Sequence, residues 1–164
     1  MGPKLFLVPV VALIVWQIGV IVAEYFLRWR RYRLALAVAR ARGKPLLVVG
    51  RPGGSIRIYG CGDVTMDINS KVLTDCPKGG VVADVRKIPF SDKYFGAAFC
   101  SHVLNVQERP EDATQGYQEL QRVADRVFVC YTSPFNLFWR FLSGETRIWL
   151  TERDGRLYAH KRPW

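Results

Sequence analysis

The chain has 164 residues, and about 120 of them lie outside an apolar N-terminal stretch. This number is enough for one domain with one core, but it is too small for a two-domain enzyme. The formal net charge of +10 is concentrated directly after that stretch, because seven basic residues and no acidic ones lie in residues 28–44. This distribution is typical of a segment that flanks a membrane helix, and we expect no nucleic-acid binding. Four widely spaced cysteines without a zinc-type spacing exclude an obvious metal site and predict reduced, mostly buried thiols.

An almost uninterrupted apolar run occupies residues 5–27. As a helix it measures roughly 34 Å, which matches a hydrocarbon core of about 30 Å. Gln17 is its only strongly polar side chain before Glu24. Only Lys4 is basic ahead of the run, whereas several arginines follow it, so the positive-inside rule predicts a single-pass membrane protein with its C-terminal domain in the cytoplasm. A cleaved signal peptide and a buried core helix are the alternatives, and the length of the run disfavours both.

The basic segment after this run is rich in strong helix formers. It ends at Gly43, a residue typical of the position after a helix, and Pro45 prevents continuation. We therefore divide the chain into a transmembrane anchor (residues 1–29), a basic juxtamembrane helix (residues 30–44) and an α/β domain (residues 45–164). The bilayer would hold residues 5–27, and anionic headgroups would meet the arginines from Arg28 to Arg33. The alternative is that these arginines only solvate one helix face.

Short apolar runs of the kind found in buried parallel strands recur through the rest of the chain. They occupy residues 46–49, 64–68, 81–85, 97–100 and 126–131. Residues 110–124 have a helical composition with acidic residues in the first turn. The alternation predicts a mostly parallel α/β sheet. Two further runs around Asp154-Gly155 predict a C-terminal β-hairpin with Asp-Gly as its turn.

The stretch with the most specific pattern is residues 84–110, DVRKIPFSDKYFGAAFCSHVLNVQERP. It resembles class I S-adenosylmethionine-dependent methyltransferases, which often show an Asp, an I/L-P-F turn, an Asp-x-x-Phe step, a strand and then Ser-His-Val-Leu. The resemblance covers residues 45–134. It implies a Rossmann-like, methyltransferase-type sheet of reduced size and S-adenosylmethionine as the cofactor.

The same resemblance implies a set of site residues. Asp67 matches the acid that binds the cofactor ribose, and Asp84 matches the acid near the adenine. Gly50 and Gly53 match the glycine-rich loop, and Ser101 is also expected to bind the cofactor. Carboxylates at the carboxyl ends of parallel strands face the ligand crevice of such sheets. The alternative is that Asp67 and Asp84 only cap loops.

His102 is the one imidazole expected near the substrate side of the crevice, and it is the sole, weak catalytic candidate. A general base needs a positioned substrate proton, and the sequence does not identify one. The simpler interpretation is a histidine that hydrogen-bonds a loop.

The glycine-rich loop departs from the family pattern. Pro52 stands where a middle glycine is usual, and Val48 where the preceding strand usually supplies an acid. Proline removes a backbone donor where the chain should approach the cofactor closely. Residues 55–63 predict a shortened or replaced helix after the loop. A second register on Gly60-Cys61-Gly62 leaves no room for that helix and is rejected. Gly96 and Asn105 are further departures, from a usual Asp and a usual Glu.

Two functions from different classes follow from these patterns. The first is a membrane-tethered methyltransferase acting on a membrane-adjacent substrate. The second is a non-catalytic subunit of methyltransferase fold, which docks in a membrane protein complex through its helix and the aromatic, basic segment at residues 139–164. A dinucleotide or nucleotide-sugar enzyme is weaker, because no G-x-G-x-x-G follows the first strand.

Overall fold

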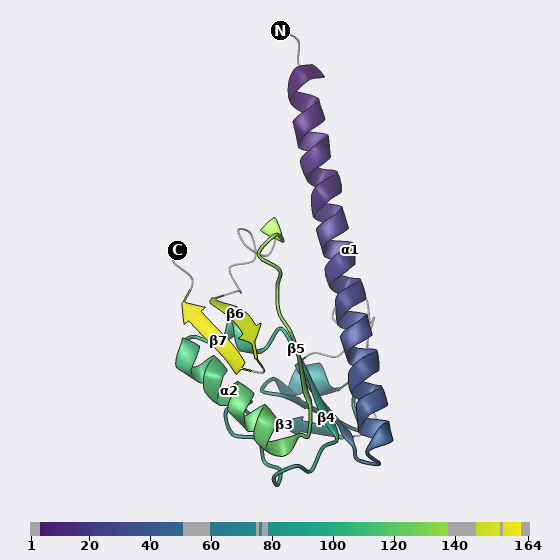
Figure 1. Cartoon of the computed structure of the whole chain (residues 1–164), viewed down its shortest axis with the longest axis vertical. Helices are drawn as coiled ribbons and strands as arrows, with labels where there is room; N and C mark the ends of the chain where they lie inside the picture. Colours follow the sequence, from purple (N-terminus) through teal and green to yellow (C-terminus); the bar gives the residue numbers. More distant parts are fainter. Residues whose placement is uncertain are drawn as a thin grey trace.

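The computed structural model describes residues 4–50, 60–74, 76, 79–137, 147–154 and 156–161. A long helix, α1 (Lys4–Ala41), leads into a sheet of five parallel strands (Figure 1). These strands are β1 (Leu46–Val49), β2 (Val64–Asp67), β3 (Gly80–Val82), β4 (Ala97–Ser101) and β5 (Val127–Cys130). Their order is β3-β2-β1-β4-β5, so the order reverses between β1 and β4. The predicted Rossmann-like, mostly parallel sheet is confirmed.

The two central strands are buried along their whole length. This is why their sequences read as continuous apolar runs rather than alternating ones. The predicted strands lie within a few residues of the observed ones, and the largest difference is at β3. That strand ends at Val82, so Asp84 lies in the loop that follows it.

The last third of α1 covers one face of the sheet. Ala35 and Ala39, one helical turn apart, are fully buried in a cluster with Leu46, Val48 and Phe99. Small side chains at this spacing let the helix lie close to β1, β4 and β5. The segment predicted as a juxtamembrane helix is therefore a structural layer of the domain. The helix is continuous through residue 29, and the division proposed there stays a prediction.

The other face of the sheet is covered by α2 (Pro110–Val123) and a C-terminal hairpin. The hairpin consists of β6 (Ile148–Arg153) and β7 (Arg156–Lys161), and it packs on α2 (Figure 1). Arg153 pairs with Arg156, and Asp154 has a left-handed φ of 51°. The predicted hairpin and the position of its turn are therefore confirmed. Two short 3₁₀ helices, η2 (Ser70–Leu73) and η3 (Leu104–Val106), follow β2 and β4.

The cysteines differ from the prediction of four reduced thiols. Cys61 and Cys76 form a disulfide, whereas Cys100 and Cys130 are free and buried. The prediction was wrong for the first pair because it considered only local spacing. Cys61 precedes β2 and Cys76 precedes β3, and the two strands are adjacent and parallel, so the chain enters both at the same edge of the sheet.

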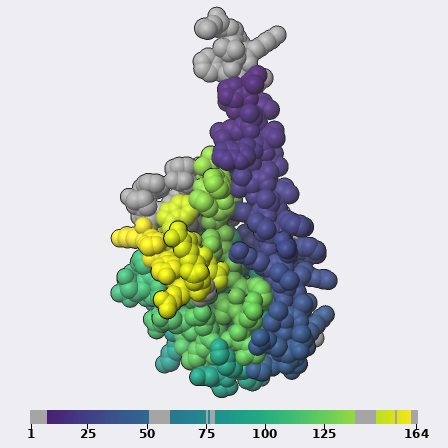
Figure 2. Space-filling model, viewed as in Figure 1, coloured from purple at the N-terminus to yellow at the C-terminus, as the bar shows by residue number. Residues whose placement is uncertain are grey.

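The N-terminal part of α1 projects away from the globular part of the molecule (Figures 1 and 2). It is the one helix in the described ranges that is long and apolar enough to cross a membrane, with a mean hydropathy of 2.2 over an 18-residue window in which no residue is buried. Its exposed large apolar side chains are Val8, Val10, Val11, Leu13, Ile14, Val15, Trp16, Ile18, Val22, Phe26 and Leu27.

Candidate cofactor site at the carboxyl ends of the strands

The ends of β1 and β4 meet closely at Gly50. This glycine has a φ of 95°, and its N–H donates to the carbonyl of Met66 over 3.0 Å. A Cβ at this position would lie 2.9 Å from Ser101 O and 2.7 Å from Val103 Cγ2. Both the backbone conformation and the lack of space therefore require glycine. In open α/β sheets, the point where the strand order reverses is where ligands bind.

Ser101 brings an unused polar atom to this point. The residue is 5 % exposed, and its Oγ has no hydrogen-bond partner among the described residues. A buried hydroxyl without a partner costs free energy, about 1–3 kcal/mol, which a bound ligand can recover. At this edge of the sheet, the glycine would let a ligand approach the backbone, and the unpaired hydroxyl would give it a hydrogen-bond partner.

Asp67 lies at the end of the neighbouring strand β2 and is half-buried. Its Oδ1 accepts from the N–H of Asn69 over 2.8 Å, which makes a local loop cap. Its Oδ2 has no hydrogen-bond partner within the described part of the chain. The side chain therefore caps its own loop and retains an acceptor for a ligand hydroxyl.

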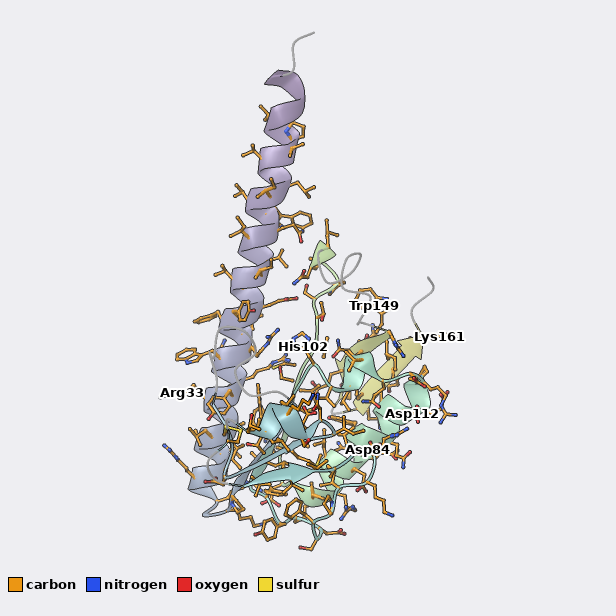
Figure 3. The ribbon with its side chains drawn as sticks, turned by 180° about the vertical axis from the view of Figure 1, so that it is seen from behind. Arg33, Asp84, His102, Asp112, Trp149 and Lys161 are labelled. Carbon is orange, nitrogen blue, oxygen red and sulfur yellow. A yellow bond between two sulfur atoms is a disulfide. The ribbon has the colours of Figure 1, made fainter. Side chains whose placement is uncertain are left out.

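Asp84 is held in an ion-pair network. The Arg86 guanidinium contacts both carboxylate oxygens of Asp84. Its Nε lies 3.0 Å from each oxygen, and its Nη2 lies 2.5 Å from Oδ2. The side-chain hydrogen bond from Arg86 lowers the pKa of the Asp84 carboxyl below its usual range. Arg86 also reaches Asp112 at 3.3 Å, and Arg109 contacts the same carboxylate at 3.1 Å. Figure 3 labels Asp84 and Asp112 in this region. The predicted adenine-side acid is thus already bound by an arginine.

His102 lies between β4 and α1 (Figure 3). Arg28 donates to its Nε2, and a guanidinium has no acceptor, so this nitrogen carries no proton. The proton is therefore on Nδ1, which donates to Thr132 Oγ1 over 3.2 Å. Burial and then the charge of Arg28 lower the pKa of the imidazole to about 3. Both nitrogens are engaged by the protein, which favours the structural interpretation over a general base.

The structure brings some of the predicted residues together and leaves others apart. Gly50, Ser101 and His102 lie at the junction of β1 and β4, and Asp67 ends the strand next to β1. Asp84 faces Arg86 instead. Gly53 and Pro52 lie outside the described residues, as does most of the segment predicted to replace the loop helix. The role of each residue stays a prediction.

The polar side chains of α1 are the site neighbours that the sequence did not reveal. Glu24 and Arg28 both reach loops at the carboxyl edge of the sheet. In the sequence, only their position indicated a role, because Glu24 interrupts the apolar run and Arg28 follows its end. Polar residues at such positions are costly and usually functional. Asn105 is a second case, because its side chain is 2 % exposed and has no partner among the described residues.

Gly96, which replaces a usual aspartate, has a structural explanation. A Cβ there would lie 2.9 Å from Ala39 Cα and 3.1 Å from Lys44 Cβ. The end of α1 occupies the space that a side chain would need, so the layer formed by α1 accounts for the glycine.

Part of the sequence and the overall fold are similar to those of known proteins. Residues 49–126 match a family model described as a methyltransferase domain, which confirms the resemblance drawn from the sequence. No curated protein matches the chain. The N-methyltransferase NodS from Bradyrhizobium japonicum WM9 is similar in structure, with a TM-score of 0.50, 10% identity, and coverage of 82% of this chain and 96% of that one. The PH0226 protein from Pyrococcus horikoshii OT3 aligns with a TM-score of 0.45, 17% identity, and coverage of 78% and 74%.

Proposed function

We propose that this chain is a membrane-anchored methyltransferase that transfers a methyl group from S-adenosylmethionine to a membrane-adjacent substrate. The match of residues 49–126 to a methyltransferase-domain model supports the reaction class. The observation that carries the proposal is the junction of Gly50 and Ser101, where a required glycine and an unpaired hydroxyl meet at the reversal of strand order.

The residues at this junction fit the cofactor. Gly50 would allow it to approach the backbone, and Ser101 Oγ would form a hydrogen bond with it. Asp67 Oδ2 suits a ribose hydroxyl at the end of the adjacent strand. When bound, S-adenosylmethionine supplies a methyl group on a positively charged sulfur that a nucleophile can attack. Asp84 would have to share its carboxylate with Arg86, so we assign it the weakest part in binding.

The helix α1 supports the membrane part of the proposal. Its projecting half exposes a run of large apolar side chains, which is costly in water and favourable in lipid. We place residues 5–27 in the bilayer. Of the arginines that follow, Arg28 binds His102 and Arg31 binds the carbonyl of Val129, so anionic headgroups would meet mainly Arg30 and Arg33.

The orientation in the membrane is a separate proposal. The excess of basic residues after the apolar run supports a cytoplasmic domain. The disulfide between Cys61 and Cys76 argues for an oxidising compartment, since such bonds are rare in the cytosol. The two orientations are distinguished by alkylating intact cells with a membrane-impermeant maleimide, using an engineered Val82→Cys on the exposed β3. Labelling of this cysteine places the domain outside the cell, and protection places it in the cytoplasm.

A non-catalytic subunit of the same fold is the second candidate. It is favoured by His102 and Asp84, whose polar atoms are occupied by Arg28, Thr132 and Arg86 rather than left for a substrate. Such a subunit would dock in a membrane protein complex through α1 and the aromatic, basic C-terminal segment.

Calorimetric titration of the detergent-solubilised chain distinguishes the two candidates. With S-adenosylmethionine and S-adenosylhomocysteine, we expect binding to the wild type and weaker binding to Asp67→Ala. The matched control is Asp92→Ala, an exposed aspartate that pairs with Arg122 on the surface. No binding at millimolar ligand would contradict the enzyme proposal. Binding by Asp67→Ala that equals binding by the wild type would contradict the placement of the ribose site. Release of the chain by alkaline carbonate would contradict the membrane anchor.

A further inference from the structure

The chain after β5 runs beside α1 (Figure 1) and hydrogen-bonds to it at two levels. At the lower level, Glu24 accepts from the N–H of Ser133 over 2.6 Å and from Asn136 Nδ2 over 2.7 Å. At the upper level, Gln17 accepts from the N–H of Leu137 over 2.9 Å and donates to the carbonyl of Phe135 over 3.2 Å. The two polar residues of the apolar helix thus satisfy an irregular backbone, as irregular chain at membrane depth requires.

An open groove lies between α1 and this segment. Its volume is about 340 Å³, within the range of about 300–1,000 Å³ found for ligand pockets. Five apolar residues line it, together with Glu24 and Ser133: Trp16, Val20, Ala23, Leu27 and Phe135. The carboxylate of Glu24 is occupied by the N–H of Ser133 and by Asn136, so the groove offers a ligand mainly hydrocarbon surface.

We propose that this groove binds one acyl chain of a membrane phospholipid. The groove opens on the helix that exposes apolar side chains along its projecting half, so its surroundings in a bilayer are lipid chains. A flexible hydrocarbon chain matches an apolar groove and needs no hydrogen bonds from it.

The lower end of the groove leads to the candidate site. Leu27 and Ser133 line it there, and their sequence neighbours Arg28 and Thr132 are the two residues that hold His102. A phospholipid whose chain lies in the groove therefore places its polar end at the carboxyl edge of β4 and β5. This step rests on the proposed function, and it makes an amphipathic lipid the substrate class.

Native mass spectrometry tests the groove without the cofactor. The full chain is reconstituted in vesicles of equal parts phosphatidylcholine and phosphatidylglycerol and extracted in dodecylmaltoside. The mass of the intact protein then shows how many lipid molecules remain bound. We expect one retained phospholipid on the wild type and loss of it in Ala23→Trp, whose indole fills the groove. The matched control is Val22→Trp, one residue away, 60 % exposed and outside the lining, which retains the lipid. Val20→Phe is a second blocking variant, and far-UV circular dichroism identifies any variant that fails to fold.

A wild type without bound lipid, or equal retention by all four proteins, would overturn the proposal. A wild-type dimer that carries no lipid would also overturn it and would show that a second copy fills the groove. Methyl transfer to lipid, followed separately with isotopically labelled S-adenosylmethionine, tests the proposed function. Lipid retention without transfer contradicts the enzyme but keeps the groove, and transfer with no retained lipid contradicts the groove but keeps the enzyme.

Discussion

Asn136 donates a hydrogen bond from Nδ2 to Glu24 Oε2 over 2.7 Å, although 112 positions separate the two residues. Asn136 is fully buried, and Glu24 lies in the apolar helix. This contact joins the loop after β5 to α1, so the helix and the carboxyl edge of the sheet form one unit.

Removal of the Glu24 carboxylate is expected to release the loop after β5. Glu24→Ala leaves the Ser133 N–H and the Asn136 amide without their acceptor, and hydrogen bonds to charged groups contribute about 1.5–3 kcal/mol each. Hydrogen–deuterium exchange in residues 131–137 should accelerate. Glu108→Ala is the control, because this carboxylate is 83% exposed and contacts Arg147 at 3.4 Å. Equal exchange in both variants would show that Glu24 does not hold the loop.

His102 is expected to make the protein less stable in mild acid. Its native pKa of about 3 lies below the ordinary 6.5, so the unfolded chain takes up a proton below pH 6.5 that the native state does not bind. The free energy of unfolding therefore falls as the pH drops from about 6.5 towards 3, by at most about 1.4 kcal/mol per pH unit from this group.

Urea denaturation of wild type and His102→Asn between roughly pH 5 and pH 8, the range in which an ordinary histidine titrates, measures this slope. Asparagine tolerates the left-handed φ of 57° at this position but does not titrate. The variant should have the shallower slope below pH 6.5. Parallel curves for the two proteins would mean that His102 titrates normally in the folded state.

A methyl group at Gly96 is expected to destabilise the domain. Gly96→Ala forces Ala39 of α1 away from the start of β4, and such overpacking costs about 1–3 kcal/mol. Gly19→Ala is the matched control, since a Cβ there meets nothing within 4 Å and alanine favours the helix. Thermal unfolding in detergent should show a lower melting temperature for the first variant alone. Two unchanged melting temperatures would contradict the tight packing of α1 on the sheet.

Loss of the disulfide is expected to lower the stability of the β2 and β3 edge. The bond closes a loop of 15 positions, for which the chain-entropy model gives about 3 kcal/mol. Cys61→Ser with Cys76→Ser should lower the urea midpoint, and dithiothreitol should do the same to the wild type only. Iodoacetamide should modify no cysteine of the native, unreduced protein, because Cys100 and Cys130 are buried. Rapid alkylation of Cys61 would show that the bond is absent.

Much of the domain could be predicted from local patterns. The run at residues 46–49 and the run at residues 97–100 indicate buried strands because both faces of each strand are covered. Asp154-Gly155 indicates a hairpin turn because few residues accept a left-handed φ. The stretch at residues 84–110 carries the family resemblance. Each of these signals depends on neighbours along the chain.

The remaining features depended on the tertiary structure. The apolar run showed that residues 5–27 form a long helix, but not that Gln17 and Glu24 hydrogen-bond the loop after β5. Cys61 and Cys76 gave no sequence signal, because only the adjacency of β2 and β3 brings them together. The sequence by itself determined the strands, the hairpin and the apolar helix, since these follow from short-range periodicity. The packing of α1 on the sheet decided the partners of His102 and the groove, since such contacts depend on which faces meet in space.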